Sequence, residues 1–284
     1  RLQLTRASMA PHLQCFYMER IRIMAQPITQ SNVTHLPADK AEREVRTQLA
    51  AAYRMVDYFG WTELIYGHLT ARVPGPEHHF LINPYGLNYD EVCASNLVKV
   101  DLHGEVVGDE DYPVSRAGFV IHSAIHMADD SSNQVVMHTH TRAGMAVAAL
   151  ESGLLPISMV STRFFDRVAY HDYEGISLYD DERERLLNSL GKKKAMILRN
   201  HGLMTVGRSV AEAFLNLYRL ERACQVQLDA AAAGPLRIID TNVADKSARD
   251  IDAFSELETS DGVGALEFAA LMRKLDKIDD SYRQ

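Results

Sequence analysis

The sequence VVMHTHTRAGMAVAAL occupies residues 135–150 and predicts the centre of the fold. It begins with the apolar run VVM, which is typical of a buried strand, and it ends in TRAGMAVAAL, which favours a helix. His138 and His140 lie between the two, where the strand is expected to end. Residues two apart on an extended chain project to the same face, so both imidazoles can offer a nitrogen to one ion.

A second apolar strand is predicted to end in the same way. The run AMIL at residues 195–198 leads into Asn200-His201-Gly202. Strand ends commonly form sites in open α/β sheets, so His138, His140 and His201 are candidate metal ligands. Three histidines leave coordination positions open for water or substrate, and imidazole suits zinc, iron, nickel or copper better than magnesium. The alternative interpretation is that they are polar loop histidines satisfied by backbone hydrogen bonds.

Helical and strand patterns alternate over residues 38–235, which predicts one α/β domain. Residues 1–37 show no clean periodicity and are expected to form a flexible arm, and residues 236–284 are expected to form a helical tail. Strands are expected within residues 64–73, 78–84, 96–107, 134–140, 168–179 and 194–202. Helices are expected over residues 38–60, 117–128, 141–150, 180–191, 209–234 and 265–278.

The composition excludes several classes of protein. Of the 284 residues, 46% are hydrophobic and 24% are charged, which is ordinary for a globular chain. The formal net charge of -8 gives no general attraction to nucleic acid or to anionic lipid. No stretch approaches the roughly 18 apolar residues that span a bilayer. The three cysteines, Cys15, Cys93 and Cys224, are far apart, which favours a reducing compartment; we therefore expect a cytoplasmic protein without nucleic-acid or membrane partners.

Several segments together resemble the class II aldolase/adducin family, in its adducin-like branch. They are LIYGHLTARVPGPEHHFLINPYGL, ASNLVKVDLHGEVV, AGFVIHSAIH, VVMHTHTRAGMAVAAL, LLPIS, VAYHDYEGI and RNHGLMTVG, and they occur in the family's order. The resemblance covers roughly residues 40–235. It implies a single αβα domain, in which helices flank a central and largely antiparallel sheet, and assembly as a homotetramer.

The resemblance also implies a cofactor and an activity. In the family's aldolases a divalent ion, usually zinc, is held by an H-x-H pair and a later histidine, and His138, His140 and His201 match those positions. Zn²⁺ is the expected cofactor, with Fe²⁺, Mn²⁺ and Co²⁺ as alternatives. The expected function is that of a lyase, an aldolase or decarboxylase, in which the ion stabilises an enediolate formed from a small sugar phosphate or oxo-acid.

The sequence departs from the active aldolases at their catalytic carboxylate. Their P-S-S-E motif corresponds here to PVSR, so Arg116 stands at the carboxylate position, or Gly118 does if the alignment is anchored at His122. Arginine stays cationic and cannot be a general base, but Arg116 can bind a substrate carboxylate or phosphate through two hydrogen bonds. Arg116, His122 and Tyr170 are the candidate catalytic residues, and Tyr170 shares the polar aromatic segment VAYHDYEG with Tyr173.

The family's phosphate-binding turns are also altered. Gly67-His68 stands where the family has a glycine–asparagine turn, and Gly86 follows Tyr85 in place of a threonine. Gly67, His68, Gly86 and Arg116 are therefore the candidate substrate-binding residues, because glycine turns can expose backbone N–H groups to an anion.

Two other functions remain open at this stage. Adducin head domains share these motifs but lack the aldolase carboxylate, so a non-catalytic scaffold that retains the metal site is one alternative. Actin and spectrin are not expected as partners, because the sequence ends at Gln284 without a lysine-rich tail. The second alternative is an Fe(II)-dependent oxygenase or decarboxylase, although the usual iron triad has two histidines and one carboxylate.

Overall fold

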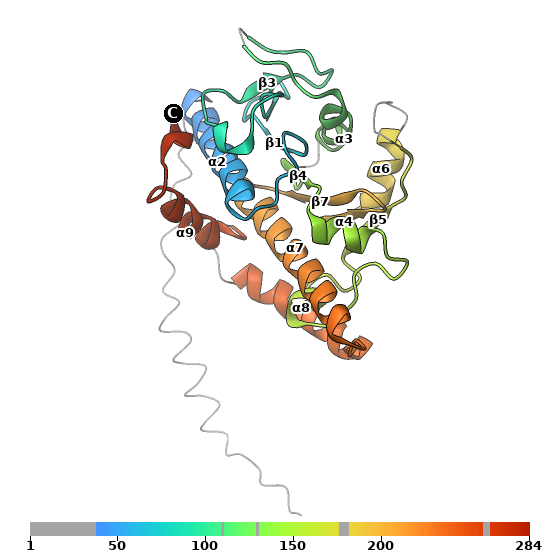
Figure 1. Ribbon diagram of the computed structural model, residues 1–284. Coiled ribbons are helices and arrows are strands. Elements are labelled where there is room, and N and C mark those ends of the chain that lie inside the picture. The colour runs from blue at the N-terminus through green and yellow to red at the C-terminus, as the bar shows by residue number, and fades with distance from the viewer. Residues whose placement is uncertain (1–37, 109–110, 129–130, 176–181, 258–261) are drawn as a thin grey trace, which may run out of the picture. The chain divides into compact units, whose positions relative to one another are not determined.

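The computed structural model describes residues 38–108, 111–128, 131–175, 182–257 and 262–284 (Figure 1). The flexible arm expected over residues 1–37 lies outside the described residues. Ala38–Gln284 forms one compact unit. Among the described helices, none combines the length and the hydropathy needed to cross a membrane.

The described strands form one seven-stranded sheet in the order β3-β2-β1-β4-β7-β6-β5. Neighbouring strands are antiparallel, except that β5 and β6 are parallel. The largely antiparallel sheet that the resemblance implied is therefore confirmed. The strands are β1 His68–Arg72, β2 Phe80–Ile82, β3 Val98–Val100, β4 Val135–Thr139, β5 Val168–His171, β6 Ala195–Leu198 and β7 Gly202–Gly207.

The helices match the periodic segments of the sequence, with two additions. The helices are α2 Ala38–Tyr58, α3 Arg116–Met127, α4 Arg142–Ala148, α5 Met159–Thr162, α6 Glu182–Leu190, α7 Val210–Ala233, α8 Thr241–Leu257 and α9 Ala265–Leu275. Helix α5 was not predicted, α8 was expected only as an undivided part of the helical tail over residues 236–284, and β7 was not separated from the loop after β6. At the start of α7 the hydroxyl of Ser209 accepts a hydrogen bond from the amide of Glu212, which stabilises the first helical turn.

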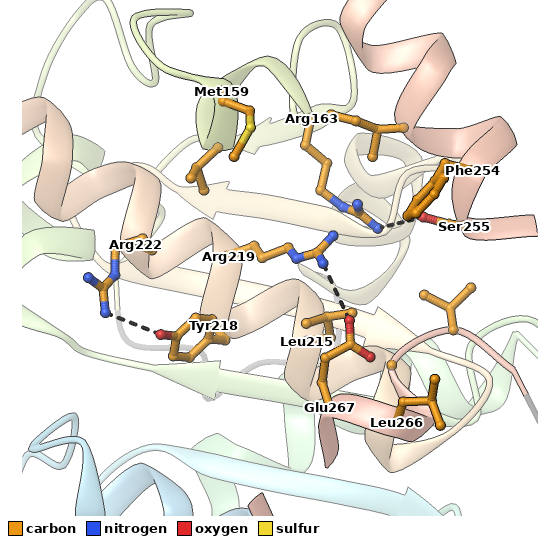
Figure 2. Close-up of a pocket in the computed structure, with 14 residues that line it drawn as sticks. Met159, Arg163, Leu215, Tyr218, Arg219, Arg222, Phe254, Ser255, Leu266 and Glu267 are labelled. Atoms are coloured by element: carbon orange, nitrogen blue, oxygen red, sulfur yellow. Dashed lines mark hydrogen bonds and ion pairs between the residues drawn. The ribbon is translucent and has the colours of Figure 1, made fainter. Parts of the chain in front are cut away.

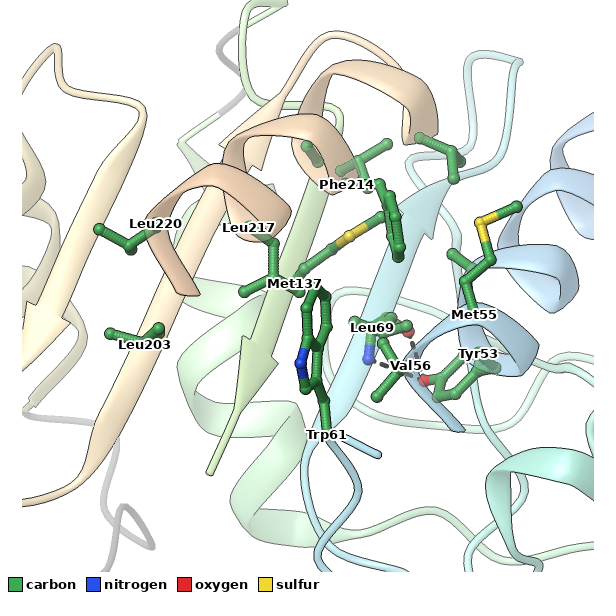
Figure 3. Packing of buried hydrophobic residues seen from close by; sticks show 14 of the residues in the cluster. Tyr53, Met55, Val56, Trp61, Leu69, Met137, Leu203, Phe214, Leu217 and Leu220 are labelled. Atoms are coloured by element: carbon green, nitrogen blue, oxygen red, sulfur yellow. Dashed lines mark hydrogen bonds between the residues drawn. The ribbon is translucent and has the colours of Figure 1, made fainter. Parts of the chain in front are cut away.

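Helices cover both faces of the sheet, because successive side chains of a strand point to opposite sides. Met137 and Leu203 face a large apolar cluster with α2 and α7, in which Trp61 and Phe214 are also buried (Figure 3). Val136, one position earlier on β4, faces a second cluster with α3 and α6. The family's αβα layering is thus confirmed.

The same alternation decides where the first histidine of the H-x-H pair points. His138 follows Met137 on β4 and therefore shares the α3 face of the sheet with Val136. Across the antiparallel pairing of β1 and β4, His68 is the partner of His138, and Thr70 is the partner of Val136. On the α3 face, histidines thus lie on the central strands β1 and β4, and the apolar cluster with Val136 extends over β7, β6 and β5.

Candidate metal centre

Two adjacent strands deliver the three candidate ligands. His138 is on β4, and His140 follows directly after its last residue. His201 lies in the three-residue loop that joins β6 to β7, where Leu198 pairs with Gly202. Asn200 occupies the left-handed region at φ 55°, which asparagine tolerates better than most residues. This conformation turns the chain between β6 and β7 and places His201 within the turn.

The three imidazoles converge through the same ring nitrogen. The Nε2 atoms of His138 and His140 are 2.8 Å apart, and those of His140 and His201 are 3.0 Å apart. One ligand atom from each of the three residues lies within 4.8 Å of the other two. His138 is fully buried, whereas His140 and His201 are partly exposed, so the convergence point is open on one side.

The outer nitrogens fix which ring atom carries the proton. His138 Nδ1 lies 2.9 Å from the carbonyl oxygen of Leu203, and His140 Nδ1 lies 2.9 Å from the carboxylate of Glu63. Both partners are acceptors, so each Nδ1 donates, and each Nε2 of the neutral ring presents a lone pair. Lone pairs that converge in this way, with the outer N–H groups held by a carboxylate and a carbonyl, fit a divalent transition metal.

Burial keeps the rings of His138 and His201 in the neutral form that binds metals. Burial is the main reason that the pKa of His138 lies well below its ordinary value, and the neighbouring His201 and His140 lower this pKa further. Burial also lowers the pKa of His201 to about 4, with His140 as the next cause. Protons therefore compete only weakly for these nitrogens at neutral pH.

Close packing holds the ligand loops in place. A Cβ atom on Gly202 would lie 2.5 Å from the carbonyl oxygen of Thr139 and 3.3 Å from the His138 and His140 rings, so only glycine fits there. Thr141 follows the H-x-H pair and donates to the buried carboxylate of Glu221 on α7, at 2.5 Å. Glu221 is 2% exposed, and this burial raises its pKa.

A second group of histidines lies beneath the triad, on the α3 face. The ring of His68 is stacked on that of His138, with ring centres 5.7 Å apart, and it meets His122 edge-on at 5.3 Å. The hydroxyl of Thr70 lies 2.7 Å from His122 Nδ1 and 2.8 Å from His126 Nε2. All three of these histidines are buried, with exposed fractions of at most 8%.

The predicted catalytic residues Arg116 and His122 both lie on α3. Arg116 is the first residue of α3, but its side chain lies outside the described part of the chain. His122 is on the same helix and fully buried, bonded to Thr70 instead of facing solvent. A Cβ atom on Gly118 would lie 2.4 Å from the His68 ring, so that ring fills the space that a side chain at position 118 would need.

The predicted tyrosine points elsewhere. The hydroxyl of Tyr170 accepts a hydrogen bond from the amide of Leu154 at 3.0 Å, and the Arg199 guanidinium lies 4.3 Å from its ring centre. The structure therefore does not bring Tyr170 to the triad. Tyr173 is the nearer tyrosine, 53% exposed and with its ring centre 6.2 Å from that of His201.

The predicted substrate-binding turns lie at the ends of two strands. Gly67 has φ 81°, and a Cβ atom there would lie 2.9 Å from the Tyr89 hydroxyl, so a larger residue does not fit. Gly86 has φ 112° with open space beside it. His68 is buried behind His138 and cannot contact a solvated ligand directly. The role of these residues in substrate binding stays a prediction.

Fold and site together define an αβα protein with a three-histidine centre at the ends of neighbouring strands. The family model of the class II aldolase and adducin N-terminal domain matches residues 47–228. The chain belongs to this family, as its sequence motifs predicted.

Two solved structures and one further relative are similar over most of the chain. An aldolase II superfamily protein from Pseudomonas syringae is 47% identical, with a TM-score of 0.78, over 93% of this chain and 99% of that one. An L-fuculose 1-phosphate aldolase from Glaciozyma antarctica is 31% identical, with a TM-score of 0.74, over 89% of this chain and 97% of that one. Alpha-adducin from Mus musculus is 44% identical over 84% of this chain, which matches 34% of the adducin.

Proposed function

We propose that this chain is a metal-dependent lyase, an aldolase or decarboxylase that acts on a small sugar phosphate or oxo-acid. The observation that carries the proposal is the convergence of three Nε2 atoms, with the outer N–H groups of His138 and His140 held by Leu203 and Glu63. The similarity to an L-fuculose 1-phosphate aldolase over 97% of that chain supports a lyase-type substrate.

His138, His140 and His201 would hold the ion, for which we propose Zn²⁺. A bound divalent ion supplies a Lewis acid for a substrate carbonyl or hydroxyl oxygen. Glu63 holds His140 in one tautomer, and the Leu203 carbonyl does the same for His138, so the ligand nitrogens are preorganised.

The residue that transfers a proton must differ from the catalytic carboxylate of the family's aldolases, because this chain has Arg116 or Gly118 at that position. Gly118 carries no side chain, and His68 fills the space next to it. Tyr173 is exposed beside His201 and has a hydroxyl that can donate a proton, so we propose Tyr173 instead of Tyr170 as the proton donor. Tyr173→Phe is expected to lower kcat about a hundredfold or more with metal content unchanged.

Metal content tests the centre directly. Purified wild-type protein is expected to contain close to one transition-metal ion per chain by elemental analysis, and His138→Ala is expected to contain none. His103→Ala is the matched control, because His103 is exposed and distant from the triad in the sequence. A wild-type protein that contains no metal and does not take up added Zn²⁺, Fe²⁺, Mn²⁺ or Co²⁺ would contradict the lyase proposal.

Turnover of sugar phosphates and 2-oxo-acids by the metal-loaded protein tests the activity itself. A non-catalytic scaffold is the second candidate, because alpha-adducin is 44% identical over most of this chain and position 118 lacks a carboxylate. A loaded protein that neither turns over nor binds any member of these panels would favour the scaffold.

Assembly and location complete the proposal. We propose a homotetramer, as the resemblance implied, and light scattering of the purified protein measures its mass. We propose a cytoplasmic location, which agrees with the free thiols of Cys93 and Cys224. A monomer in solution would contradict the proposed homotetramer.

A further inference from the structure

A pocket remote in sequence from the histidine centre lies between α5, α7, α8 and α9 (Figure 2). Its volume is about 410 Å³, within the range of about 300–1,000 Å³ that is usual for small-molecule sites. None of the three metal-ligand candidates lines it. Its walls combine apolar side chains with three arginines, namely Arg163, Arg219 and Arg222.

The apolar part of the lining is unusually exposed. Met159 on α5 is 78% exposed, Phe254 on α8 is 59% exposed and Leu266 on α9 is 63% exposed. Exposed large apolar side chains that come together from three helices mark a binding surface more often than a solvated one. Methionine and phenylalanine also adapt well to the apolar body of a ligand.

The positive charge of the pocket is poorly balanced. Arg163 has no carboxylate within ion-pair distance among the described residues, and its one hydrogen bond, to the Ser255 hydroxyl, is 3.5 Å long. Among the described residues of the lining, Glu267 is the only acidic one, and Arg219 reaches it at 3.5 Å. Burial, and next the charge of Arg219, lower the pKa of Arg163 to about 10, while the charges of Asp252 and Glu267 act in the opposite direction, so Arg163 remains a cation at neutral pH.

The adjoining surface is cationic as well. A neighbouring pocket of about 350 Å³ shares Arg163 and also carries several basic side chains. There, Arg167 is paired with Asp252 at 2.9 Å, and Arg208 with Glu212 at 3.2 Å. Lys192, Lys193 and Lys194 add further positive charge there, so the first pocket differs in the exposed apolar side chains of its lining, which the second pocket lacks.

We propose that this pocket binds a small amphipathic anion. A carboxylate or phosphate head accepts hydrogen bonds from Arg163 and Arg219, and an apolar body lies against Met159, Phe254 and Leu266. Guanidinium groups suit both heads, because their N–H donors match two oxygens of one oxyanion. The inference does not depend on the proposed lyase activity, and the two can fail separately.

Calorimetric titration of the full, metal-loaded chain with octanoate, octyl phosphate and 1-octanol tests the proposal. We expect at least one anion to bind at least about tenfold more tightly than 1-octanol, because charge-assisted hydrogen bonds are the strong ones. Octanoate alone would identify a carboxylate head, and octyl phosphate alone would identify a phosphate head. Equal affinity for 1-octanol, or no anion binding below about millimolar concentration, would overturn the proposal.

Matched variants locate the site. Arg163→Gln is expected to weaken anion binding about tenfold or more while metal content stays unchanged. Arg249→Gln is the control, because Arg249 lies on α8 outside the lining and is paired with Asp245. If Arg163→Gln does not fold, as thermal melting would show, Arg219→Gln serves in its place. Anion affinity equal to that of Arg249→Gln in a folded Arg163→Gln protein would also overturn the proposal.

Discussion

Two clusters of three histidines lie within one layer of this protein, and only one of them suits a metal. In the triad, Nε2 atoms 2.8 and 3.0 Å apart converge on one point, and acceptors hold the outer nitrogens of His138 and His140. In the second cluster, His122 and His126 both turn a ring nitrogen to the hydroxyl of Thr70. The number of histidines is the same, so the difference lies in what their other nitrogens contact.

Solvent access separates the two clusters as well. His140 and His201 are partly exposed, so a substrate can reach the triad, whereas His68, His122 and His126 are buried. Thr70 has one hydroxyl proton for two rings, so one ring must donate and the other accept. Among the described residues, no hydrogen-bond partner lies next to the buried atoms His122 Nε2 and His126 Nδ1. The second cluster is therefore a structural network, in which two buried ring nitrogens without partners lower the stability of the fold. The triad, by contrast, is a preorganised set of metal ligands.

Removal of the shared hydroxyl should damage the second cluster alone. Thr70→Val leaves the two rings without their partner, at about 1–3 kcal/mol of unfolding free energy for each. Urea unfolding measures this loss, and metal content should stay at the wild-type value. Thr139→Val is the matched control, because the buried Thr139 hydroxyl has no partner in the described part of the chain and its removal should not destabilise the protein. Equal stability of the two variants would contradict the assigned network.

Removal of the Glu63 charge behind the triad should weaken metal binding and leave the stability of the metal-free protein unchanged. Glu63→Gln keeps an acceptor for His140 Nδ1 but loses the carboxylate charge, so Zn²⁺ affinity should fall about ten- to hundredfold. Competition with a chelator measures the affinity, and the metal-free protein should unfold at the same urea concentration as wild type. Glu105→Gln, at an exposed position, is expected to change neither quantity. A Glu63→Gln protein with wild-type affinity would remove Glu63 from the centre.

The sequence was sufficient for the parts of the site that are local. The patterns VVMHTH and AMILRNHG each place histidine at a strand end, and the structure brings these ends together. Glu63 was missed, because it precedes β1 and meets His140 only through the pairing of distant strands. Tyr170 was chosen by composition, but the alternation along β5 turns it towards Leu154.

The elements that were missed have identifiable causes. The segment of β7, GLMTVG, begins directly after the loop that carries His201 and is bounded by glycines, and it was left unassigned after the strand predicted over residues 194–202. Helix α8 is polar overall, but Ala244, Ala248 and Ile251 recur at helical spacing, a signal that could have revealed it. That helix forms one wall of the arginine-lined pocket, so the pocket could not be foreseen from the motifs.

Acid should destabilise the metal-free protein through the buried cluster. Burial lowers the pKa of His126 to about 3 from an ordinary 6.5, so the unfolded chain binds a proton below pH 6.5 that the folded chain does not. Each such histidine adds about 1.4 kcal/mol per pH unit to the loss of stability as pH falls from 6.5 towards 3. His126→Leu should reduce this slope by one proton, and His103→Leu, at an exposed site, should leave it unchanged. Urea unfolding between pH 6.5 and 4.5 measures the slope, and an unaltered slope in His126→Leu would show that His126 does not resist protonation.

The smallest effect is expected where backbone conformation, not a side chain, places a ligand. The side chain of Asn200 is exposed, while its φ of 55° directs the chain into His201. Asn200→Gly should therefore preserve Zn²⁺ affinity and stability, because glycine adopts this conformation freely. Asn200→Val should cost about 1–2 kcal/mol, since a β-branched residue is strained there, and should weaken Zn²⁺ binding as the loop shifts. If valine and glycine proved equivalent in both measurements, the position of His201 would depend on the packing of its ring instead of the turn.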